Sequence, residues 1–403
     1  MSDLLKTKDP IEFRFPVDAE WLFITTLILC VAIFAFFIPT ANLSTYLLYV
    51  SFLLLSEFFV FLSDLSNHKL ASLFFFTLGI VIFGSLMAFR NKTGIDDRTY
   101  ELIFTHIQNN DLSHSLISSN IEKGYILLNY ITSFLGITNY CHVITITSYI
   151  SFLFWGIALW RFRKKCNLTV MVLLLWSNFY FFVMYAGLVR IFISLPIALI
   201  AYDLVSQRKI KSFLIMVILG SLFHRSAFIL LILTPLFKDS VVYHWKSFTA
   251  TLFILMPIVF FFVAKVIVPF LGARYSSYGI IGAFNISIGK FDILPLWIIA
   301  AYFFQFVDSE SKKTYTLGII ALSLSMFFSI WSSLVNLGRL IFYANLGILI
   351  IASCIFKQKP VGIIEKFTPC IFVVYSFVYV MHTTFLNPLC TNYLFPYRSY
   401  LFE

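Results

Sequence analysis

The chain has 403 residues, of which 60% are hydrophobic and 19% aromatic, and its formal net charge is +10. Only 12% of the residues are charged, against about 25% in a soluble globular domain. This composition excludes a soluble fold, a disordered or collagen-like chain, a disulfide scaffold and a coiled coil. We therefore expect one all-α polytopic membrane domain over residues 1–403.

The excess of basic residues is typical of the cytoplasmic loops of a membrane protein, and we expect no nucleic-acid partner. The six cysteines show no CxxC and no cysteine–histidine spacing of a metal site, so we expect no metal and no disulfide framework. The polar N-terminus lacks the pattern of a signal peptide. Because no P-loop, GxGxxG, GxSxG or HExxH motif occurs, we expect no cofactor.

Membrane-spanning helices need about 17–25 apolar residues. In chain order the clear candidates are 21–39, 43–63, 71–89, 141–161, 168–187, 190–207, 248–271, 291–307, 315–333, 340–356 and 368–386. Two stretches are ambiguous, because 125–138 is short and 212–237 is interrupted by His224 and Arg225. These segments predict a helical bundle with about 11–13 crossings.

The positive-inside rule resolves both ambiguities. We place the N-terminus in the cytoplasm and 125–138 on the outer surface as an interfacial helix, so that 161–165, with its four basic residues, falls inside. If 212–223 and 226–237 form a short re-entrant-like hairpin with its tip outside, seven later lysines also fall inside. As α-helices, the limbs would each be about 18 Å long. The C-terminus and a polar cap at 90–138 then lie outside.

In this topology, lysine and arginine are distributed unequally between the two sides of the membrane. The inner side holds 14 Lys and 4 Arg, whereas the outer side holds 3 Lys and 7 Arg. The outer arginines are Arg90, Arg98, Arg190, Arg225, Arg274, Arg339 and Arg398. Any one of them is explained by a lipid head group or an ion pair with a carboxylate. Seven on one face favour a phosphate-bearing ligand, because guanidinium binds phosphate in a bidentate manner.

Four sequence blocks resemble those of the EpsG/Wzy group of bacterial polysaccharide (O-antigen) polymerases. They are Gly94-Ile95-Asp96 with Tyr100, Glu122-Lys123-Gly124-Tyr125, Arg190 before an apolar span, and Phe223-His224 with Ser226-Ala227. Arg339 with Tyr343, and Pro396-Tyr397, are similar to late features of the family. Ile191 departs from the family pattern, which usually has Gln there, so a polar role at that position is in doubt.

The resemblance implies a GT-C-like, metal-independent glycosyltransferase in the bacterial plasma (inner) membrane, with its active site on the outer face. Such enzymes transfer a growing glycan from undecaprenyl diphosphate to the non-reducing end of another lipid-linked repeat unit, so both donor and acceptor are undecaprenyl-diphosphate-linked oligosaccharides. The product is an O-antigen, a capsule or an exopolysaccharide. The resemblance also implies the lipid bilayer and a chain-length regulator as partners.

Candidate residues follow from the chemistry of this transfer. A general base is needed for the acceptor hydroxyl, and the candidates are His224, Asp96 and Glu122. Cations are needed for the leaving diphosphate, and the candidates are Arg190, Arg339, Arg225 and Arg274. The candidates for sugar contacts are Tyr100, Tyr125, Tyr397 and Arg398. With one base and no covalent intermediate, we expect inversion at the anomeric centre.

Two other functions remain open. An O-antigen ligase-like glycosyltransferase uses the same class of donor and differs in its product. A lipid-linked glycan or solute transporter would show broken helices at matching places in two halves, whereas the break at 212–237 is single. Intramembrane charges would favour the transporter, and the candidates are Glu57, Asp203 and Lys265.

Overall fold

The computed structural model describes residues 19–91, 93–118, 121–238, 244–262, 293–331, 338–358, 363–387 and 392–401. Over these residues every regular element is a helix, and an isolated β bridge joins Arg90 to Ser399. The chain is therefore an all-α polytopic membrane protein, as its composition predicts.

The apolar helices follow the predicted spans in order. Among the described residues, six helices are long and apolar enough to cross a membrane, and they are α2 (Leu43–Leu65), α3 (Lys69–Ala88), α7 (Tyr140–Phe162), α10 (Val189–Ser206), α15 (Ser309–Trp331) and α16 (Gly338–Lys357). The other apolar helices are α1 (Ala19–Ala35), α8 (Leu168–Leu175), α9 (Phe181–Ala186), α11 (Ile210–Phe223), α13 (Trp245–Phe262), α14 (Leu294–Phe303) and α17 (Ile363–Val380). Two π-helical segments, Trp176–Tyr180 and Met381–Phe385, continue α8 and α17. The number of crossings stays a prediction.

Helix α10 lies in the core of the bundle. Every residue from Val189 to Val205 is buried, as expected for a helix that is apolar on all sides. Helix α11, in contrast, exposes Leu214, Ile215 and Ile218 on one side, where the surrounding lipid would contact it. Any group at the start of α10 is therefore held by packing from several helices.

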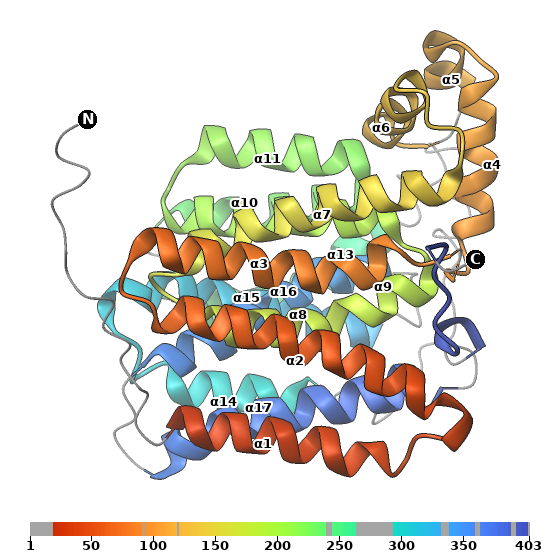
Figure 1. The fold of residues 1–403 in the computed structure, drawn as a ribbon. Helices are drawn as coiled ribbons and strands as arrows, with labels where there is room; N and C mark the ends of the chain where they lie inside the picture. Colours follow the sequence, from red (N-terminus) through yellow and green to blue (C-terminus); the bar gives the residue numbers. More distant parts are fainter. Residues whose placement is uncertain are drawn as a thin grey trace, which may run out of the picture.

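The polar segment 90–138 folds as a cap at one end of the bundle (Figure 1). It contains α4 (Asp97–Gln108), α5 (Leu112–Ser118) and α6 (Lys123–Phe134). The 12 residues of α6 make a helix about 18 Å long, whereas the hydrocarbon core of a bilayer is about 30 Å thick. Helix α6 is therefore shorter than an ordinary span, and the place of 125–138 on the outer surface stays a prediction.

The interrupted stretch 212–237 is a helical hairpin, as predicted. Helix α11 ends at Phe223, His224 is extended with φ −153° and ψ 116°, and a 3₁₀ helix, η4 (Arg225–Phe237), follows. The prediction of two α-helical limbs is wrong for the second one. A 3₁₀ helix rises about 2.0 Å per residue, so the 13 residues of η4 cover about 26 Å.

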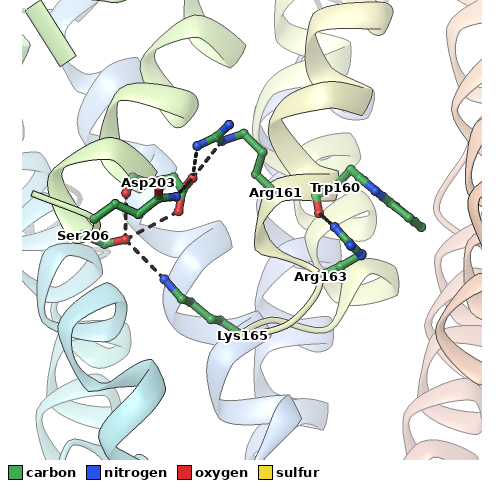
Figure 2. A network of polar contacts seen from close by, with 7 residues as sticks. Trp160, Arg161, Arg163, Lys165, Asp203 and Ser206 are labelled. Carbon is green, nitrogen blue, oxygen red and sulfur yellow. Dashed lines mark hydrogen bonds and ion pairs between the residues drawn. The ribbon is translucent and has the colours of Figure 1, made fainter. Parts of the chain in front are cut away.

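A polar network joins the helix ends opposite the cap (Figure 2). The Nε of Arg161 donates to Oδ2 of Asp203 at 2.7 Å, and the Nζ of Lys165 donates to the Ser206 hydroxyl at 3.3 Å. The Nζ of Lys357 donates to the carbonyl of Arg163 at 2.7 Å. This network ties α7, α10 and α16 together, and it gives Asp203 an ion-pair partner in Arg161.

The contact between α15 and α16 depends on glycine. A Cβ on Gly347 would lie 2.6 Å from the carbonyl oxygen of Gly318 and 2.9 Å from the backbone nitrogen of Leu322, and backbone atoms cannot turn aside. A Cβ on Gly156 of α7 would meet only side-chain atoms, at ordinary distances of 3.7 and 3.9 Å.

We expect Gly347→Ala to lower stability by about 1–3 kcal/mol through overpacking. Gly156→Ala is the matched control, because it gains up to about 1 kcal/mol of helix propensity without a clash. Unfolding of the purified protein in detergent, with heat or added denaturing detergent, measures both variants. If Gly347→Ala were as stable as Gly156→Ala, the close approach of α15 and α16 would be wrong.

Candidate active site

Arg190 joins three segments that are far apart in the sequence. Its Nη1 donates to the carboxylate of Glu122, and its Nε donates to the Tyr100 hydroxyl at 3.1 Å. Its guanidinium carbon also lies 5.3 Å from the centre of the Tyr100 ring, in a cation–π contact. The first turn of α10 thus holds the starts of α4 and α6 against the bundle.

This ion pair is buried. Arg190 and Glu122 are 8% and 7% exposed, and a charge at that depth without a partner would be strongly destabilising. Burial acts to raise the pKa of the Glu122 carboxyl, but Arg190 and then His224 outweigh it and leave this pKa below its ordinary value. Glu122 is therefore an anion at neutral pH and a weaker base than an ordinary carboxylate.

Glycines allow the segments around the pair to approach closely. A Cβ on Gly94 would lie 2.6 Å from the Cα of Gly187, which has a positive φ of +70° and ends α9. A Cβ on Gly124, at the start of α6, would lie 2.7 Å from the carbonyl oxygen of Leu222 in α11. The glycines of the first two sequence blocks therefore set the backbone positions around Arg190.

The hairpin tip completes the cluster. The amide of Arg225 donates weakly to Oε1 of Glu122 at 3.5 Å, and His224, 5% exposed, lies close enough to lower the pKa of that carboxyl. The Tyr343 hydroxyl donates to Ser194 at 2.8 Å, and Ser194 donates to the carbonyl of Gly220 at 3.0 Å. This chain of hydrogen bonds fixes the hairpin against α10 and α16.

Asp96 and Arg339 lie at the edge of the same cluster. Burial raises the pKa of the Tyr100 hydroxyl, and the negative charge of Asp96 raises it further. The positive charges of Arg190 and Arg339 act in the opposite direction. Asp96 is half-buried before α4, whereas Arg339 and Arg225 are exposed. The structure thus brings together seven of the predicted residues, which are Asp96, Tyr100, Glu122, Arg190, His224, Arg225 and Arg339.

Tyr125 packs beside these seven residues, and its ring meets that of Tyr100 edge-on with 5.3 Å between the centroids. Tyr100 is 2% exposed and Tyr125 is 1% exposed. A ring that stacks on a sugar needs an open face, so in this structure these two rings pack behind Arg190 instead of presenting a stacking surface.

The C-terminal candidates lie elsewhere. The Tyr397 hydroxyl donates to the carbonyl of Leu86 at 2.9 Å, and its ring meets Tyr49 edge-on at 5.8 Å. The carbonyl of the exposed Arg398 accepts from the amide of Asn91 at 2.9 Å. These contacts fasten the tail to α2, α3 and the start of the cap. Arg274 lies outside the described residues.

A second buried pair was not anticipated. Arg90, counted above among the outer arginines with a possible ligand, is fully buried and paired with Asp97 at 3.0 Å. The Oδ2 of Asp97 also accepts from the amide of Gly94 at 2.8 Å. Asp96 and Asp97 are neighbours, and successive helical side chains point about 100° apart, so only one can turn inward. Nothing in the sequence pattern indicated which one.

One comparison with known proteins gave a match. The family model described as the EpsG family matches residues 73–399, which contain the whole cluster. No curated protein and no solved structure matches the chain.

We expect Arg190→Met to destabilise the protein by about 3–5 kcal/mol, because it leaves the Glu122 carboxylate buried without its partner. Arg190→Met combined with Glu122→Leu should recover most of that loss, because no buried charge remains. Unfolding of the wild type, the single variant and the double variant in detergent tests this. Equal losses in the single and double variants would show that the pair is not coupled.

Proposed function

The chain belongs to the EpsG family, and from this premise we propose that it joins oligosaccharide repeat units carried on undecaprenyl diphosphate. Family membership supports a polysaccharide polymerase-like role in a membrane. The observation that carries the finer proposal is the convergence of all four sequence blocks on one cluster at the cap end. There, exposed arginines lie beside a buried ion pair and a histidine.

The arginines have two different roles in this proposal. Arg190 is held by Glu122 and Tyr100, so it positions the cluster and contributes positive potential. Arg225 and Arg339 are exposed, and we assign the binding of the donor diphosphate to their guanidinium groups. As the bond between the sugar and the diphosphate breaks, negative charge grows on the leaving phosphate oxygen, and fixed cations stabilise it.

His224 is the proposed base. An imidazole can accept a proton from a hydroxyl group, and the adjacent Glu122 anion would stabilise the imidazolium that forms. The acceptor hydroxyl gives its proton to His224 while its oxygen attacks the anomeric carbon from the side opposite the diphosphate. The new glycosidic bond forms as the old one breaks, so the configuration inverts. Asp96, half-buried at the start of α4, is the alternative base.

We expect His224→Ala and Arg339→Ala to leave mostly single-repeat glycans in a strain that lacks its own copy of the gene. Loss of the base should slow transfer by about 10²–10⁴-fold. Arg98→Ala is the matched control, because Arg98 is also an exposed arginine and lies in the first turn of α4, within the cap. A gel of lipid-linked glycans, with membrane levels of each variant checked, measures the result.

The product separates the alternatives. Long lipid-linked chains that are never passed to a final acceptor would indicate a ligase. Normal polymer in a strain without the gene would overturn the polymerase proposal. Retention of configuration in the new linkage would overturn the single-displacement mechanism.

We also propose that the cap lies outside the cell membrane and the Arg161–Asp203 network inside. Ser113 in α5 and Ser309 at the start of α15 are both exposed, and they belong to opposite ends in the predicted topology. A membrane-impermeant thiol reagent should label Ser113→Cys in intact cells but Ser309→Cys only after permeabilisation. The described native cysteines are buried or half-buried, which keeps the background low. The reverse labelling pattern would invert the topology.

A further inference from the structure

A pocket of about 550 Å³ opens in the cap, at the end of α4 and α6 away from Arg190. Ligand pockets commonly have volumes of about 300–1,000 Å³. Its wall includes the turn that follows α4, with Gln108, Asn109, Asn110 and Asp111. None of the residues that carry the proposed transfer lines it, so it is a separate feature of the cap.

The lining has the chemistry of a carbohydrate site. Three side-chain amides and one carboxylate offer both donors and acceptors, as a ligand rich in hydroxyls requires. Tyr130, His114 and Phe134 add rings that can pack on the apolar face of a sugar. Neither lysine nor arginine is among the described residues that line it, and Asp111 adds a negative charge, so the lining suits a neutral ligand better than a phosphate.

Two of the amides are already fixed. The Nδ2 of Asn110 donates to the carbonyl of His106 at 2.7 Å, and the Nε2 of Gln108 donates to the carbonyl of Ile137 at 3.3 Å. These bonds hold the side chains in place without a ligand, which reduces the entropy lost on binding.

Helix α6 presents three different faces, because successive residues point about 100° apart. One face is buried in the cap, and its residues are Tyr125, Asn129 and Thr132. The next face lines the pocket through Tyr130 and Ser133. The third is apolar and exposed, with Leu127 at 46%, Ile131 at 46% and Leu135 at 68%. Such an apolar face is typical of a helix that rests on a membrane surface, so the pocket would open beside the lipid.

The pocket and the proposed transfer site share the same two helices. Helix α4 places Tyr100 at the Arg190 cluster and Gln108 at the pocket, eight residues or about 12 Å further along. Helix α6 runs from Tyr125 at the cluster to Phe134 at the pocket. An oligosaccharide that reacts at the cluster can therefore extend along the cap into the pocket.

We propose that this pocket is a glycan-binding subsite that holds a neutral segment of the growing chain while its reducing end reacts at the Arg190 cluster. The ligand class rests on the proposed function. A chain held at a second place stays bound between transfers, so the subsite would set the length of the product.

Two readouts test the subsite. The first is binding of the repeat-unit oligosaccharide, released from the strain's own polymer by mild acid, to purified protein by saturation-transfer NMR. The second is the length distribution of lipid-linked glycans in the complemented strain. Tyr130→Ala removes a ring from the pocket, Ser133→Trp fills it, and Tyr302→Ala removes a half-exposed tyrosine from α14 as the control.

We expect Tyr130→Ala and Ser133→Trp to weaken oligosaccharide binding by about tenfold and to shorten the glycans without abolishing polymerisation. Tyr302→Ala should bind the oligosaccharide like the wild type. Unchanged binding and length in both pocket variants would overturn the subsite. If the wild type made no polymer yet bound the oligosaccharide through Tyr130, the proposed function would fail and the binding site would remain.

Discussion

The buried ion pair between Arg190 and Glu122 is the constraint around which the cap end is organised. A guanidinium at this depth needs its carboxylate within hydrogen-bonding distance, because an uncompensated buried charge costs several kcal/mol. Glu122 precedes α6 and Arg190 lies in the first turn of α10, so the pair fixes the cap on the bundle. The backbones can meet only because Gly94, Gly124 and Gly187 carry no side chain.

The hairpin of α11 and η4 shows how the break at His224 is tolerated beside the buried pair. A bilayer offers no water to satisfy open backbone groups, so an extended residue must lie within protein. His224 is that residue: its amide donates to the carbonyl of Gly220 at 2.9 Å, and its own carbonyl accepts from Ala227 at 3.0 Å. Gly220 and Ala227 are small enough to let the limbs approach. The same small residues thus satisfy the backbone and bring the imidazole beside Glu122.

Much of the fold follows from the sequence because hydropathy and charge act over whole segments. The spans, the short cap helix and the hairpin at 212–237 were all predictable in this way. The 3₁₀ form of η4 and the π-helical segments after α8 and α17 were not, because they depend on local packing and carry no hydropathy signature. For the site, the blocks indicated which residues lie together but not which residues pair.

That difference changes how the outer arginines are understood. A count of arginines on one face suggested a single large anion site, yet Arg90 and Arg190 use their guanidinium groups to hold the protein's own carboxylates. Arg225 and Arg339 are the exposed arginines among the predicted diphosphate residues that the structure describes. In the proposed transfer, the buried pairs would hold the base and the backbone in place, and the exposed arginines would stabilise the charge that moves onto the departing diphosphate.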